Sequence, residues 1–184
     1  ETDICEELRQ LDMPKIRFVC EFTPQEAAET GLDRVRFLMS ANVGEALKPL
    51  SKVASGGELA RIMLAMKQVL AQQDGVPTLI FDEVDAGVSG RAAQKVALKL
   101  WAVSKGRQVL CVTHLPQIAA MADAEFTVEK RVEHERTYTS VLHLDGSGRR
   151  QELARLIGGS MITETTLAGA AELLRLADEA KRGI

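Results

Sequence analysis

Residues 77–113 read PTLIFDEVDAGVSGRAAQKVALKLWAVSKGRQVLCVT, and they carry the clearest indication of the fold class. It starts with a short apolar run at 77–82 and ends with a second one at 108–113. Between the runs, residues 90–104 carry apolar side chains at helical spacing. Short, nearly all-apolar runs are typical of strands buried on both faces of a parallel sheet. The stretch therefore predicts a strand–helix–strand unit with parallel strands and a right-handed crossover.

Chemically active residues stand at the end of each predicted strand. Asp82 and Glu83 follow the first strand, and His114 follows the second. Ligands of open α/β sheets bind beyond the carboxyl ends of the strands. We therefore expect these three side chains to face one crevice.

Two adjacent carboxylates after an apolar strand are typical of a Walker B element. Asp82 would hold a magnesium ion, usually through a water, because that ion keeps part of its hydration shell. Glu83 would activate the attacking water as a general base, and His114 would contact the terminal phosphate of ATP. The alternatives are two solvated acids and a histidine that caps the helix starting at Pro116.

A second motif, Ser55-Gly56-Gly57-Glu58, opens a predicted helix that closes at Asp74-Gly75 and whose apolar residues, from Leu59 to Leu70, are expected in the core. One interpretation is a capping box with Ser55 as N-cap. Capping does not explain the two glycines, because each costs about 1 kcal/mol against Ala inside a helix. Glycines are expected where something approaches the backbone closely, and free N–H groups beside a hydroxyl suit a phosphate. The motif therefore indicates an anion site.

The loop that leaves the acidic pair contains Asp85, Gly87, Val88 and Ser89. One interpretation is a plain turn in which Ser89 is the N-cap of the next helix. The other is a loop that lines a dimer interface between two ATP sites.

The remaining segments complete the α/β pattern. They are predicted to be a helix over 1–12 ended by Pro14, strands over 15–23 and 34–41 around a polar loop at 24–33, a short helix from Pro116 to about Ala122, a hairpin over 125–132 and 137–144, and helices over 149–157 and 163–182.

Composition argues against some classes of function. The 184 residues carry a net charge of −3, so no global basic field indicates nucleic acid. Four basic residues are interpreted as solvated surface, with DNA contact as the alternative: Arg34, Arg36, Lys48 and Lys52. The 3 cysteines are widely spaced and are expected to be reduced thiols. The sequence has no long apolar run and no signal peptide, so no membrane partner is expected.

The sequence also lacks any Gly-Lys pair. A Gly-rich loop ending in Gly-Lys-Ser/Thr is what cradles the phosphates in P-loop ATPases. The chain does not begin with Met and is expected to be part of a longer protein. We therefore expect that it does not hold ATP by itself.

Three strings, VASGGELARIMLAMK, TLIFDEVDAGVSG and VLCVTHLPQIAAMAD, resemble the RecN family of bacterial DNA repair proteins. That family is similar to the SMC group of ABC ATPases. The resemblance runs from about residue 15 to the C-terminus. The combination of FDEVDAGVSG with THLPQIA is more typical of RecN than of SMC proteins or ABC transporters. Glu58, where transporters commonly carry Gln, points the same way.

The resemblance implies the C-terminal lobe of an ABC/SMC-type P-loop NTPase head, with a mostly parallel sheet flanked by helices and a C-terminal hairpin. Residues 1–13 would be the end of a returning coiled-coil helix. Residues 14–184 would be the C-terminal half of the ATPase head, and the Walker A half would lie elsewhere in the parent protein.

The resemblance also implies residue roles, with ATP and Mg²⁺ as cofactors. Asp82 matches the magnesium aspartate, Glu83 the catalytic glutamate and His114 the switch histidine. The signature motif, which binds ATP held by the opposite head, matches Ser55, Gly56, Gly57 and Glu58. The D-loop matches Asp85, Gly87, Val88 and Ser89, with Ser89 standing where Asp is usual in SMC proteins and transporters.

The implied function is ATP hydrolysis by the full-length protein in double-strand break repair and recombination, while this chain alone is expected to be inactive. Two heads would close on two ATP molecules and part after hydrolysis. The implied partners are the N-terminal half, a second head in a homodimer and double-stranded DNA, in the cytoplasm at the bacterial nucleoid. The alternatives are an ABC ATPase of another class (a transporter or SMC-type chromosome protein) and a non-catalytic dimerisation module.

Overall fold

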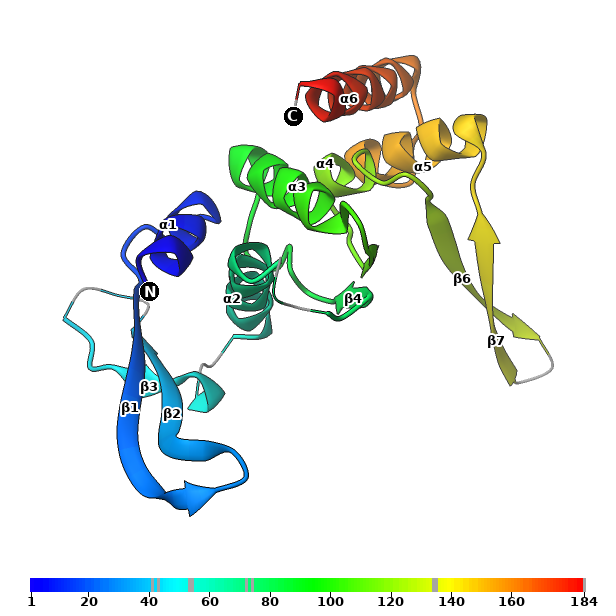
Figure 1. The fold of residues 1–184 in the computed structure, drawn as a ribbon. Coiled ribbons are helices and arrows are strands. Elements are labelled where there is room, and N and C mark those ends of the chain that lie inside the picture. The colour runs from blue at the N-terminus through cyan, green and yellow to red at the C-terminus, as the bar shows by residue number, and fades with distance from the viewer. Residues whose placement is uncertain are drawn as a thin grey trace. The chain divides into compact units, whose positions relative to one another are not determined.

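The computed structural model describes residues 1–40, 42, 44–52, 55–71, 73, 75–133 and 136–183. Asp74, at the predicted end of the helix after Ser55, lies outside this set. The chain splits into two compact units, Glu1–Val112 and Thr113–Ile184 (Figure 1). Each unit is described by itself.

The first unit contains three helices, a short 3-10 helix and two sheets within its described residues. In chain order they are α1 (Thr2–Gln10), β1 (Arg17–Ala28), β2 (Gly31–Ser40), β3 (Lys48–Pro49), η1 (Leu50–Lys52), α2 (Gly56–Val69), β4 (Thr78–Phe81), α3 (Gly90–Ser104) and β5 (Gln108–Cys111).

The predicted strand–helix–strand unit is confirmed. β4 and β5 pair in parallel, with Leu79 opposite Val109 and Phe81 opposite Cys111. α3 connects them and has the bounds that its apolar spacing predicts. Its buried face consists of Ala93, Val96, Ala97, Leu100 and Val103.

The expectation that these strands are buried on both faces is wrong for the chain as described. Leu79 and Phe81 are buried, but Ile80 on the opposite face is 70% exposed. Leu110 and Val112 are also exposed. Only β4 and β5 form this sheet among the described residues, so one apolar face is left without cover.

α1 packs against α2 and contributes to the core. The predicted apolar face of α1 is confirmed, because Ile4 and Leu8 in the helix and Leu11 just after it are buried. An ion pair also joins α1 to α3, with Glu7 Oε2 2.6 Å from Lys99 Nζ. Both side chains are mostly covered, so the end of α1 is fixed to two helices.

β1 and β2 form a long antiparallel hairpin, visible as a curved ribbon in Figure 1. The prediction of a loop over 24–33 is wrong, because the pairing of β1 with β2 continues to Ala28 opposite Gly31. The register shifts between Pro24 and Ala28, and irregular edge positions of this kind tolerate proline and polar residues. Phe18 is buried at the base of the hairpin, whereas Phe22 is 64% exposed.

The second unit contains α4 (Pro116–Ala119), β6 (Phe126–Glu133), β7 (Arg136–His143), α5 (Gly146–Gly158) and α6 (Glu164–Arg182). The predicted hairpin is confirmed, with Val128 opposite Val141. α5 begins earlier than predicted, because the Asp145 side chain accepts a hydrogen bond from the Gly148 N–H at 2.7 Å and caps the helix. α5 and α6 lie side by side (Figure 1).

Candidate functional site

The acidic pair lies in a tight loop directly after β4. Glu83 has a φ of 57°, in the left-handed region, which costs about 1–2 kcal/mol for a residue other than glycine. Asp82 Oδ1 accepts a hydrogen bond from the Glu83 N–H at 2.9 Å. The Ala86 N–H donates to the Glu83 carbonyl at 3.0 Å and closes the turn. Both carboxylates are exposed, so the loop presents them to solvent in a fixed local geometry.

The first turn of α2 lies directly on this loop. A Cβ added to Gly57 would lie 2.7 Å from Ala86 Cβ and 3.0 Å from the Glu83 carbonyl oxygen. A Cβ added to Gly56 would collide with Glu83 Oε2. The glycines were expected where something approaches the backbone closely. For Gly57, the chain's own Glu83–Ala86 loop makes that approach.

Ser55 is the N-cap of α2, as predicted. Its Oγ accepts a hydrogen bond from the Glu58 N–H at 3.4 Å, which is one half of a capping box. Ser55 and Gly56 are exposed, while Gly57 is buried. The exposed hydroxyl and the exposed part of the helix N-terminus therefore remain accessible beside Glu83.

The loop that follows the acidic pair is partly buried. Asp85 is 3% exposed and Val88 is buried, with the Val88 N–H donating to the Asp85 carbonyl at 3.2 Å. Gly87 has a φ of 74°, a conformation that favours glycine. Ser89 is the N-cap of α3 as predicted, although its side chain makes no capping hydrogen bond in the described part of the chain.

Sequence reasoning missed Arg61, which lies at the junction of α2 and this loop. Its Nη1 donates a hydrogen bond to the Ala86 carbonyl at 2.7 Å, and the residue is 8% exposed. The predicted apolar stripe from Leu59 to Leu70 is partly wrong, because Leu59 and Met63 are more than one-third exposed. The buried face of α2 is Gly57, Arg61, Ile62, Leu64 and Ala65. A charged side chain at a core position is not what helical spacing of apolar residues indicates, so the local sequence carries no signal for Arg61.

The pKa of the Cys111 thiol depends on its burial and on the nearby acidic side chains. Cys111 lies on β5 opposite Phe81. Burial, and then the negative charges of Asp85 and Asp82, raise the pKa of the Cys111 thiol to about 12. This thiol is therefore neutral at physiological pH and a weak nucleophile.

His114 belongs to the second unit and is exposed. It is not the cap of the following helix, because the N-cap of α4 is Leu115. The Leu115 N–H instead donates to Thr113 Oγ1 at 3.0 Å. The predicted proximity of His114 to Glu83 links the two units and stays a prediction.

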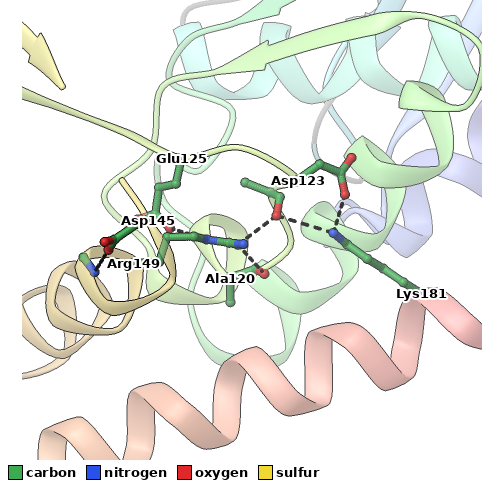
Figure 2. Close-up of polar contacts among 8 residues, drawn as sticks. Ala120, Asp123, Glu125, Asp145, Arg149 and Lys181 are labelled. Carbon is green, nitrogen blue, oxygen red and sulfur yellow. Dashed lines mark hydrogen bonds and ion pairs between the residues drawn. The ribbon is translucent and has the colours of Figure 1, made fainter. Parts of the chain in front are cut away.

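A polar cluster holds the segment after α4 (Figure 2). Arg149 on α5 donates from Nη2 to the Ala122 carbonyl at 2.8 Å and from Nε to Glu125 Oε2 at 3.2 Å. Lys181 on α6 contacts Asp123 Oδ1 at 2.6 Å. Burial raises the pKa of Glu125, and the hydrogen bond and charge of Arg149 act in the opposite direction. Two C-terminal helices thus fix the chain just beyond His114.

Among the residues that the structure describes, no group of three or more His, Cys, Asp or Glu side chains is placed to hold a metal ion. The exposed carboxylate of Asp82 can still hold a hydrated cation through a water, which is how Mg²⁺ is commonly held. None of the helices in the described ranges has the length and apolarity needed to span a bilayer.

Comparison with known proteins confirms the resemblance. The chain is 46% identical to the DNA repair protein RecN of Bacillus subtilis (strain 168), over 97% of the chain and 34% of that protein. It is 47% identical to the DNA repair protein RecN of Treponema pallidum (strain Nichols), over 96% of the chain and 32% of that protein. The chain thus spans about a third of the length of these relatives. No protein-family model matches the sequence.

Solved structures agree on the fold. The Smc head domain with a coiled coil and joint from Pyrococcus yayanosii has a TM-score of 0.60 at 22% identity, covering 83% of this chain and 28% of that one. A chain from work on ATP-driven dimerization and DNA stimulated activation of SMC ATPases has a TM-score of 0.52 at 21% identity, covering 87% and 92%. The chain therefore has the α/β fold of an SMC-type head lobe.

Proposed function

We propose that this chain is the signature and Walker B half of an ATP-hydrolysing head in a RecN-like DNA repair protein. One observation carries the proposal. The first turn of α2, with Ser55 exposed, packs through Gly57 onto the strained loop that presents Asp82 and Glu83. A helix N-terminus suited to phosphate and a carboxylate pair suited to metal and water are thereby joined in one rigid local unit.

Each candidate residue has a chemical task in this proposal. Glu83 takes the proton from the attacking water, and His114 contacts the terminal phosphate. Asp82 holds Mg²⁺ through a water, and the ion neutralises charge on the phosphates when bound. The exposed Ser55 hydroxyl and the helix N-terminus bind ATP held by a second head, and the Asp85–Ser89 loop lines that interface through its exposed Gly87 and Ser89, while Asp85 and Val88 are buried beneath them.

The exposed apolar faces support a larger parent protein. Two-stranded sheets are marginal alone and need a covered apolar face. Each of the three sheets in the described residues instead leaves large apolar side chains in solvent. The exposed residues are Phe22 and Val35 on β1–β2, Ile80 and Leu110 on β4–β5, and Phe126, Val128 and Val141 on β6–β7. We infer that the rest of the protein, including its phosphate loop, covers these faces.

The wider role follows from the relatives. Because the RecN proteins are named for DNA repair, we propose that two heads form a homodimer whose ATP cycle acts on double-stranded DNA during double-strand break repair and recombination, in the cytoplasm at the nucleoid. We also propose that residues 1–13 are the end of a returning coiled-coil helix, whose helix α1 packs against α2 and forms an ion pair with α3.

A comparison of the isolated chain with the full-length protein tests this proposal. ATP hydrolysis is measured for the chain alone, for the full-length protein, and for both with added double-stranded DNA. We expect no turnover by the chain alone and steady turnover by the full-length protein. Turnover by the chain alone at the full-length rate would contradict the division of the ATP site between two segments.

A further inference from the structure

We propose that Arg61 is a positioning residue that locks the Glu83–Ala86 loop to the first turn of α2. The inference rests on the proposed function, because it assigns the residue that holds the catalytic carboxylate and the signature helix in one geometry. Within the described residues, the hydrogen bond that Arg61 donates goes to a backbone carbonyl and not to a carboxylate.

Two residues of α2, Gly57 and Arg61, both contact Ala86 of the loop. From the first turn, Gly57 lies so close that an added Cβ would meet both Ala86 Cβ and the Ala86 carbonyl oxygen. One turn later, Arg61 Nη1 donates to that carbonyl at 2.7 Å. The Ala86 N–H also donates to the Glu83 carbonyl. Contacts that fix Ala86 therefore also restrain Glu83, whose backbone is in the left-handed region.

The charge environment of Arg61 joins a third element to this junction. Burial lowers the pKa of the Arg61 guanidinium, and the negative charges of Glu58 and Asp12 act against that effect. Glu58 stands in the first turn of α2, and Asp12 follows the end of α1 with a φ of 65°. Arg61 therefore lies among charges from the end of α1 and from α2 while it holds the loop.

The energetics favour a geometric task over a stabilising one. Nε of Arg61 is buried and has no acceptor within the described part of the chain. Burying a guanidinium with incomplete pairing costs free energy, and apolar residues of similar size often replace such groups without loss of stability. What an apolar replacement cannot supply is the directed N–H bond that keeps the Ala86 carbonyl, and with it Glu83, in place.

The experiment uses the full-length protein with Arg61→Met and a matched control, Arg107→Met. Arg107 Nη2 also donates to a backbone carbonyl at 2.7 Å, that of Ala71 just beyond the opposite end of α2. We measure kcat and KM for ATP together with Tm. A charged hydrogen bond is worth enough to change a rate about tenfold to a hundredfold. We expect Arg61→Met to lower kcat by that factor with KM within about twofold.

The control separates positioning from folding. Arg107→Met is expected to lower Tm at least as much as Arg61→Met while kcat stays within about twofold. Arg61→Lys keeps one charged donor and is expected to recover part of the lost kcat. If Arg61→Met does not fold, Arg61→Leu, which also lacks an N–H donor, replaces it with the same expected results.

Two results would overturn the inference. One is an Arg61→Met protein whose kcat matches the wild type, and the other is an equal loss of kcat in Arg107→Met. Glu83→Gln is assayed in parallel to test the proposed function separately. If Glu83→Gln abolishes hydrolysis but Arg61→Met does not change it, only the role of Arg61 is wrong. If Glu83→Gln hydrolyses ATP normally, the proposed function itself is wrong.

Discussion

Gly57→Ala is the substitution that most sharply tests the contact between α2 and the acidic loop. The added methyl would lie 2.7 Å from Ala86 Cβ and 3.0 Å from the carbonyl oxygens of both Ala86 and Glu83. Carbon atoms pack without repulsion at about 3.5–4.0 Å. The helix and loop would therefore have to separate by roughly 1 Å, and two of the three obstacles are backbone atoms.

The magnitude follows from two opposing terms. Overpacking of this kind costs about 1–3 kcal/mol. Replacing glycine by alanine inside a helix returns about 1 kcal/mol. We therefore expect a net loss of stability of up to about 2 kcal/mol. Separation of the loop from α2 would also displace Glu83, so we expect kcat to fall.

The assay compares Gly57→Ala with Gly169→Ala in urea unfolding and ATP hydrolysis by the full-length protein. Gly169 lies inside α6, where an added Cβ would meet only Ile157 Cδ1 at an ordinary 3.8 Å. The control should therefore be neutral or stabilising by about 1 kcal/mol, with unchanged kcat. If Gly57→Ala behaves like this control, the close packing of α2 on the Glu83–Ala86 loop is refuted.

Two further predictions concern buried titratable groups. Because burial raises the folded-state pKa of Glu125, its stabilising contribution is full below the unfolded pKa and is lost as pH rises through the folded pKa. The Tm of the wild type should therefore fall relative to Glu125→Gln as pH rises above about 4, the ordinary pKa of a glutamate, and parallel Tm curves would contradict this. With a pKa of about 12, Cys111 is about one part in ten thousand thiolate at pH 8. Its alkylation by iodoacetamide should be at least about a hundredfold slower than that of a free small thiol, and an equal rate would show that the burial is wrong.

Local patterns predicted the part of the fold that depends on neighbours in sequence. The bounds of α3 and the parallel pairing of β4 with β5 follow from helical spacing between two short apolar runs. The full length of the β1–β2 hairpin was not predicted, because Pro24 and the polar residues after it indicate a loop when read alone. Cross-strand pairing, which sequence spacing does not reveal, keeps that segment extended.

Burial was less predictable than secondary structure. Leu59, Met63 and Ile80 have the character of core residues, yet the described chain leaves them exposed. Their exposure depends on which other segments cover them, and a local pattern carries no such information. Arg61 shows the reverse case, a charged residue buried because the loop carbonyl of Ala86 gives it a partner.

The candidate site was predictable in its residues but not in its contacts. The acidic pair and the Ser55–Glu58 motif are recognisable as short strings with known chemistry. Their direct packing depends on Gly57 and Ala86 meeting across a turn, and on a left-handed Glu83 that propensity alone disfavours.

The role of Glu83 as general base is tested by ATP turnover of full-length Glu83→Gln, with Glu26→Gln on the exposed hairpin as the matched control. If Glu83 is the general base, the first variant should still bind ATP, lose at least about a hundredfold in kcat and accumulate as a closed dimer, while the control turns over normally. Wild-type kcat in Glu83→Gln would contradict the assignment of this loop as the catalytic element.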